Sequence, residues 1–206
     1  MQEAIVIHRP DTPPLQLLLL FHGVGARAED MLPLGQALAQ AMPQACVISV
    51  RSPHAGDMGG GWQWFSVRGV DEANRPARVA AAMPSFVDAV QHWQRDTGVG
   101  AEATTLVGFS QGAIMALEST QQPVPLASRV VSLAGRFAQA PRVATPHTRV
   151  HLLHGEQDGV MPLRLAVQAH DQLTALGTDT TLDLFPGLGH GLDNRVVRRL
   201  LQHLQT

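Results

Sequence analysis

Residues 108–112 of the chain have the sequence GFSQG. A serine with glycines two positions before and two positions after it is suited to nucleophilic catalysis. These residues match the pattern G-x-S-x-G and lie between a predicted strand (104–109) and a predicted helix (113–120). A sharp turn from strand to helix would hold the serine in a strained backbone conformation, and the flanking glycines would let strand and helix approach closely. The hydroxyl of Ser110 would then be exposed near the positive end of the helix. The pattern therefore predicts a nucleophilic serine.

A serine hydroxyl is a weak nucleophile, so a base and an orienting acid must lie nearby. Asp158 follows the predicted strand 149–153, and His190 follows the predicted strand 181–185. In an open α/β sheet, sites form beyond the carboxyl ends of the strands. We therefore predict that Asp158 fixes the tautomer of His190, which takes the proton of Ser110 and later returns it to the leaving group.

Other interpretations of these two loops remain open. Asp158 and His190 could each be ordinary loop residues, because Asp and Gly are common in turns. Glu156, Asp183 and Asp193 are weaker candidates for the acid. Asp183 falls inside a predicted strand, and Asp193 is predicted to cap the last helix.

A second glycine-containing turn, residues 22–25 (HGVG), follows the most apolar predicted strand, 15–21. Such a turn can direct a backbone N–H toward the negative oxygen that develops during acyl transfer. We predict that the donors are the backbone N–H groups of Val24 and Gln111, with no role required of their side chains. The alternative is a loop that merely needs glycines.

Aromatic residues are scarce, yet Trp62, Trp64 and Phe65 gather with Met58 in an irregular stretch, residues 52–75. These side chains could line a pocket for the acyl or alcohol part of a substrate. They could equally form a small satellite core beneath the loop.

Three histidines, His147, His151 and His154, are close in sequence, but no carboxylate or Cys spacing completes a ligand set, and strand alternation places His151 and His154 on opposite faces. We therefore expect no metal site. No G-x-G-x-x-G follows a strand, so no cofactor is expected either.

The single cysteine, Cys46, lies in an apolar run and is predicted to be a buried core thiol.

Composition excludes several classes of protein. The chain has 206 residues, 45% of them hydrophobic and 16% charged, as in a soluble globular domain. The net charge of −2 comes without a basic block, which argues against nucleic-acid binding. The start lacks a signal-peptide pattern, and the most apolar run is too short to cross a membrane. We expect a cytoplasmic protein with no membrane insertion, a monomer or homodimer.

Predicted strands alternate with predicted helices, which indicates an α/β fold with a mainly parallel central sheet flanked by helices. No repeat or linker divides the chain, so residues 1–206 are read as a single domain. The predicted strands are 5–7, 15–21, 46–50, 104–109, 129–133, 149–153 and 181–185, and the predicted helices are one capped by Asp30, then 76–97 (which Pro84 kinks or divides), 113–120, 163–176 and 194–204.

Together these motifs resemble the phospholipase/carboxylesterase family of α/β-hydrolases, which includes acyl-protein thioesterases and small bacterial carboxylesterases. The segments that carry the resemblance are 22–25, the pair Trp64-Phe65, 108–112, 154–158 with Val160 and Pro162, and Gly189-His190. The resemblance spans nearly the whole chain, and the longest similar segments resemble an enterobacterial esterase branch.

The resemblance implies a catalytic triad on Ser110, Asp158 and His190, with oxyanion donors on Val24 and Gln111. It implies no metal or organic cofactor, and hydrolysis of carboxylic esters or thioesters with short to medium acyl chains. The main expectation is a serine carboxylesterase that acts on small-molecule esters through an acyl-enzyme. The alternatives are a thioesterase or lysophospholipase, which pocket shape would decide, or a non-catalytic α/β-hydrolase-fold binding protein.

The chain departs from acyl-protein thioesterases just before Trp64, where residues 59–61 are glycines instead of apolar residues. This difference argues against a long groove for a lipid acyl chain and favours smaller esters.

Overall fold

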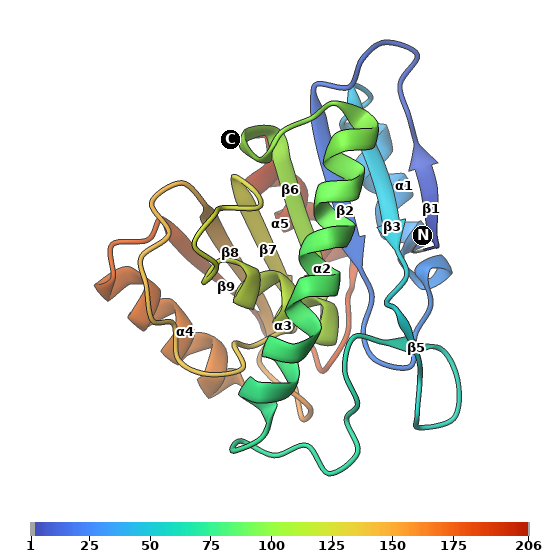
Figure 1. The fold of residues 1–206 in the computed structure, drawn as a ribbon. Coiled ribbons are helices and arrows are strands. Elements are labelled where there is room, and N and C mark those ends of the chain that lie inside the picture. Colours follow the sequence, from blue (N-terminus) through green and yellow to red (C-terminus); the bar gives the residue numbers. More distant parts are fainter. Residues whose placement is uncertain (1–2, 206) are drawn as a thin grey trace.

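A seven-stranded sheet crosses the centre of the protein, as Figure 1 shows. The structure is a computed structural model that describes residues 3–205. All neighbouring strands are parallel except β1, which is antiparallel to β3. In spatial order the strands are β1 (Ala4–His8), β3 (Ala45–Val50), β2 (Gln16–Phe21), β6 (Thr104–Phe109), β7 (Arg129–Leu133), β8 (Arg149–Gly155) and β9 (Thr180–Phe185). The predicted mainly parallel sheet is confirmed.

Helices cover both faces of this sheet (Figure 1). Helices α2 (Arg75–Thr97), α3 (Gln111–Ser119) and α4 (Leu163–Ala175) lie on one face. Helices α1 (Leu32–Ala41) and α5 (Asn194–Leu204) lie on the other. A strand buried on both faces needs apolar residues at every position, which explains the continuous apolar run of β2.

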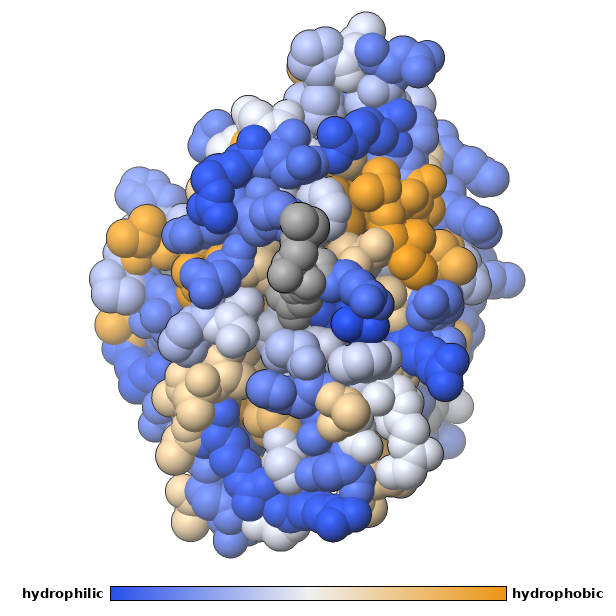
Figure 2. Space-filling model, turned by 45° about the vertical axis from the view of Figure 1, so that its right-hand side comes forward, coloured by the Kyte–Doolittle hydropathy of each residue, from blue (hydrophilic) through white to orange (hydrophobic). Residues whose placement is uncertain are grey.

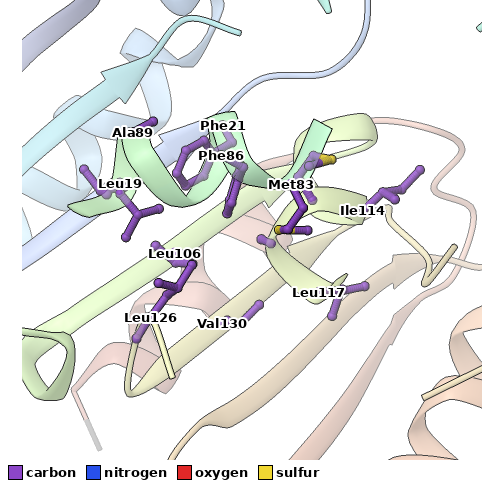
Figure 3. Packing of buried hydrophobic residues seen from close by; sticks show 14 of the residues in the cluster. Leu19, Phe21, Met83, Phe86, Ala89, Leu106, Ile114, Leu117, Leu126 and Val130 are labelled. Carbon is purple, nitrogen blue, oxygen red and sulfur yellow. The ribbon is translucent and has the colours of Figure 1, made fainter. Parts of the chain in front are cut away.

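Alternate residues of β2 pack into two separate cores. Leu19 and Phe21 belong to the core beneath α2 and α3 (Figure 3), and the ring centroid of Phe21 lies 4.5 Å from that of Phe86. Leu18 and Leu20 belong to the core beneath α1 and α5. This alternation follows from the strand geometry, in which successive side chains point to opposite faces.

One of the two alternatives at Pro84 is excluded, and one helix cap is corrected. Helix α2 continues through Pro84, so no new helix begins there, and the kink stays a prediction. Asp30 is not the cap of α1 but lies in a short 3-10 helix, Ala28–Met31, where its carboxylate accepts a hydrogen bond of 2.8 Å from the Arg27 N–H. Asp193, in contrast, caps α5 as predicted, by accepting from the backbone N–H of Arg195.

The long connection between β3 and α2 contains two paired two-residue strands, β4 (His54–Ala55) and β5 (Trp62–Gln63). The face shown in Figure 2 is mostly hydrophilic, and its largest hydrophobic area is compact. Within residues 3–205, no helix has the length and apolar character needed to cross a membrane.

A partly buried cluster of polar side chains joins helix α5 to β8 and β9. The His203 ring stacks on that of His151 with centroids 4.0 Å apart, and the His203 Nε2 lies 2.6 Å from an Asp183 carboxylate oxygen. The His151 Nδ1 lies 2.8 Å from the Thr181 hydroxyl oxygen. Burial, together with the charges of His203 and Arg129, lowers the pKa of His151 to about 3.

This pKa predicts that acid destabilises the fold. Below about pH 6.5 the unfolded chain binds a proton at His151 that the folded chain does not bind, so stability falls as pH falls. The expected contribution is up to about 1.4 kcal/mol per pH unit between pH 6.5 and 3. We expect His151→Asn to lose this part of the pH dependence, measured by urea unfolding at a series of pH values.

His147→Gln is the matched control, because His147 is exposed and its replacement should leave the pH dependence unchanged. Identical pH dependence in the native protein and in His151→Asn would contradict the prediction.

Candidate active site

Ser110 occupies the sharp turn between β6 and α3. Its backbone has φ 53° and ψ −113°, a conformation that costs a non-glycine residue of the order of 1–3 kcal/mol. A Cβ on Gly108 would lie 2.4 Å from the Gly112 carbonyl oxygen, and a Cβ on Gly112 would lie 2.2 Å from the Phe21 carbonyl oxygen. The predicted need for small residues two before and two after the serine is therefore confirmed.

The structure brings the three predicted triad residues into one hydrogen-bonded chain. The Ser110 Oγ lies 2.9 Å from the His190 Nε2, and the His190 Nδ1 lies 2.8 Å from the Asp158 Oδ2. The Asp158 side chain is fully buried, while that of His190 is 18% exposed. This arrangement of atoms can withdraw a proton from the Ser110 hydroxyl.

The surroundings of Asp158 fix its charge. Burial by itself would raise its pKa, but hydrogen bonds from His190 and from the Met161 and Val160 backbone N–H groups outweigh burial and hold the pKa below its usual value. An ionised carboxylate only accepts hydrogen bonds, so the His190 Nδ1 must donate to it. In the neutral tautomer with the proton on Nδ1, the Nε2 lone pair is the one that faces the Ser110 hydroxyl.

The loops that carry the acid and the base pack directly against each other. The Gln157 N–H donates to the Leu188 carbonyl at 2.9 Å, and a Cβ on Gly155 would lie 2.4 Å from the same oxygen. This close backbone contact holds Asp158 and His190 at hydrogen-bond distance although 32 residues separate them.

The other candidate acids are engaged elsewhere or face outward. Glu156 is exposed, Asp183 contacts His203, and Asp193 caps α5. Asp158 is the candidate that hydrogen-bonds His190.

Sequence reasoning missed two contacts of the triad. His154, for which no contact with Asp158 was predicted from the sequence, is buried with its Nε2 2.7 Å from the Met161 carbonyl oxygen and 3.5 Å from the Asp158 Oδ2. The ring of Phe109 lies 5.2 Å from that of His190. His154 lies near the end of β8, next to the loop that carries Asp158, and this position is the sequence signal that could have predicted the contact.

No group of three or more potential metal ligands occurs within residues 3–205.

The turn that carries Val24 lies beside the serine. A Cβ on Gly23 would be 3.2 Å from the Ser110 Cβ. Gln111 is the first residue of α3, and the first N–H groups of a helix have no acceptor within it. These two segments therefore border the same space next to the hydroxyl.

His22 supports the turn at residues 22–25 through contacts made by its ring nitrogens. Its Nδ1 lies 2.8 Å from the Gly23 carbonyl oxygen, and its Nε2 lies 3.2 Å from the Ser52 backbone nitrogen, which donates to it. Burial lowers the pKa of His22 and keeps the ring neutral, as an accepting nitrogen requires.

The four residues predicted for a substrate pocket do not form one pocket. Trp64 and Phe65 lie in the main core, where the Trp64 ring is 5.0 Å from that of Phe86. Met58 is 70% exposed, and Trp62 lies beneath the Arg51 guanidinium at 3.6 Å. The large rings are buried because the core removes more apolar surface from water than a shallow loop would.

Comparisons with known proteins give a consistent picture. The model of the family described as Phospholipase/Carboxylesterase matches residues 2–206. Esterase YpfH of Escherichia coli (strain K12) is 48% identical over 200 residues, which cover 97% of this chain and 86% of that protein. Acyl-protein thioesterase 1 of Neurospora crassa is 26% identical over 163 residues, covering 72% and 65%. The crystal structure of esterase PE8 has a TM-score of 0.86 at 26% identity, covering 99% and 97%.

The tight contact at Gly112 predicts a large steric effect. Gly112→Ala should destabilise the protein by at least about 2 kcal/mol, because the new methyl group would overlap the carbonyl of Phe21. Thermal and urea unfolding would measure this loss. Gly191→Ala is the matched control, since nothing lies within 4 Å of a Cβ at that position. Equal stability of the two variants would show that the turn tolerates a side chain.

Proposed function

Since this chain belongs to the phospholipase/carboxylesterase family of hydrolases and acts on carboxylic esters, we propose that it cleaves small esters through an acyl-enzyme formed on Ser110. The observation that carries the proposal is the hydrogen-bonded chain from the Ser110 Oγ through His190 to the buried carboxylate of Asp158. The same arrangement of a serine, a histidine and a carboxylate carries out acyl transfer on several unrelated folds.

In the acylation step, the Ser110 Oγ attacks the ester carbonyl carbon while the His190 Nε2 takes the hydroxyl proton. The carbonyl oxygen becomes an oxyanion, which accepts hydrogen bonds from the backbone N–H groups of Val24 and Gln111. Collapse of this tetrahedral intermediate breaks the bond to the alkoxy oxygen. His190 gives its proton to that oxygen, and the alcohol leaves.

In the deacylation step, water takes the place of the alcohol. His190 removes a proton from water, and the resulting hydroxide attacks the acyl carbon. The second tetrahedral intermediate collapses with return of the proton to the Ser110 Oγ, which releases the carboxylic acid. Asp158 remains ionised throughout and stabilises the imidazolium that forms in each step.

A thioester substrate would pass through the same steps, and the similarity to an acyl-protein thioesterase favours testing it. The chain itself favours short acyl groups, because the aromatic residues Trp64 and Phe65 are buried in the core instead of lining an acyl groove. Our expectations of a cytoplasmic location, of no cofactor, and of a monomer or homodimer remain predictions.

Substitution of the triad tests the mechanism. Ser110→Ala and His190→Ala should each lower kcat for a p-nitrophenyl ester by at least about 10³-fold, because the residues act as a unit. A fluorophosphonate probe should label the native protein at Ser110 and should not label Ser110→Ala, as judged by peptide mapping.

Asp158→Asn tests the acid assignment separately. We expect kcat to fall by about 10²- to 10⁴-fold, because the amide cannot hold the Nδ1–H tautomer of His190. Glu156→Gln is the control, since Glu156 is exposed, and it should retain full activity. Full activity in Asp158→Asn with loss in Glu156→Gln would transfer the role to Glu156.

Chain-length dependence tests the substrate class. We expect kcat/KM for p-nitrophenyl esters to be highest for acetyl to hexanoyl groups and to fall at least about tenfold by the palmitoyl ester, because residues 59–61 are glycines and the rings of Trp64 and Phe65 are buried in the core. Acyl-CoA thioesters of the same lengths give the parallel series. Preference for palmitoyl esters, or for thioesters of any length, would favour the thioesterase or lysophospholipase alternative.

A further inference from the structure

The side chain of Gln111 forms hydrogen bonds of its own, in addition to the backbone N–H that we propose as a donor to the oxyanion. Gln111 is 2% exposed, and its carboxamide does not face solvent or the triad. Its Oε1 accepts a hydrogen bond of 2.8 Å from the Trp64 backbone N–H, and its Nε2 donates one of 2.8 Å to the Phe65 carbonyl. The amide therefore pairs with the backbone of the β3–α2 connection as a neighbouring strand would.

The backbone that receives these bonds is itself fixed. Trp64 is 1% exposed, and its ring packs against those of Phe21 and Phe86, at centroid distances of 6.1 and 5.0 Å. Phe65 belongs to the same core. The carboxamide is thus bonded to a part of the loop that cannot shift without opening the core.

The same short segment also holds the other proposed donor. Two residues before Trp64, the Trp62 carbonyl accepts from the Gly25 N–H at 2.9 Å, and the Trp62 N–H donates to the Ala26 carbonyl at 2.8 Å. These bonds fasten the turn that contains Val24, because Gly25 directly follows it. Gly61 reinforces the contact, since a Cβ there would lie 1.9 Å from the Gly25 carbonyl oxygen.

We propose that the side-chain amide of Gln111 is a positioning group, which sets the separation of the Val24 and Gln111 backbone N–H groups by tying both to residues 62–65. The inference rests on the proposed function, because it concerns the oxyanion of ester hydrolysis. Oxyanion donors act only when they are held at 2.7–3.1 Å from the developing charge, so a small displacement of either one weakens catalysis. The side chain acts through the backbone and does not touch the substrate.

Gln111→Met tests this role, because Met has similar length and volume but lacks the amide. We expect kcat to fall about 10- to 100-fold with little change in KM, since displacements of about 1 Å can cost about 10²-fold in rate. Rates are normalised to sites titrated with the fluorophosphonate probe. Binding of phenylboronic acid, which forms a tetrahedral adduct with an active serine, should weaken by a similar factor.

Gln111→Glu provides a second variant with a distinct signature. A protonated carboxyl group can accept from the Trp64 N–H and donate to the Phe65 carbonyl, whereas the buried carboxylate cannot donate. Its activity relative to the native protein should therefore rise as pH falls from 8 to 6. A role limited to fold stability would lower the melting temperature without producing this profile in active-site-normalised rates.

Gln121→Met is the matched control. The Gln121 Oε1 also accepts from loop backbone N–H groups, those of Arg142 at 2.7 Å and Val143 at 3.1 Å, but at the far end of α3. Its loss should leave kcat unchanged. If the native protein is active and Gln111→Met has unchanged kcat and unchanged boronate binding, this inference is overturned while the proposed function stands. A native protein that neither reacts with the probe nor hydrolyses any ester would overturn the proposed function and this inference with it.

Discussion

The structure of the site depends on how closely the first turn of α3 approaches the ends of β2 and β6. The absence of side chains at Gly108 and Gly112 permits this approach, because a single methyl group at either position would overlap a backbone oxygen. The approach in turn forces Ser110 into its strained conformation. The strain is of the order of 1–3 kcal/mol, and the buried apolar residues on both faces of the sheet offset it.

Near that turn, the buried side chains of Asp158 and His22 each have the charge state that their hydrogen-bond partners require. Asp158 is ionised because His190 and two backbone N–H groups donate to it, which overcomes the effect of burial on its pKa. His22 is neutral because burial disfavours its charge, and only a neutral ring can accept from the Ser52 N–H. Burial disfavours the charged form at both residues, and the local hydrogen-bond donors decide which charge state is present.

The connection between β3 and α2 belongs to the site through its backbone, although its large side chains are turned away. Trp64 and Phe65 are buried in the core, and this burial makes their peptide groups rigid partners for Gln111. Trp62 similarly offers its backbone to the turn after Val24. A segment that reads as an irregular loop therefore acts as a brace between two neighbouring turns.

The sequence by itself determined the order of strands and helices and the residues of the candidate triad. These features depend on local patterns: apolar runs predict the strands, and the placement of Ser110, Asp158 and His190 after strand ends predicts that they meet. The strand bounds were recovered closely, since β6 and β7 begin and end as predicted. The need for glycine at Gly108 and Gly112 could also be predicted, because the sharp turn is itself a local feature.

Only the tertiary structure decided which side chains face the core and which face the site. The aromatic cluster around Trp64 could not be assigned from sequence, because an irregular loop has no periodicity that fixes the direction of its side chains. The partners of Gln111, His22 and His154 were equally out of reach, since each bonds to backbone groups that sequence patterns do not locate. Hydrogen bonds of this kind depend on how separate loops are brought together by packing, which no local pattern of residues encodes.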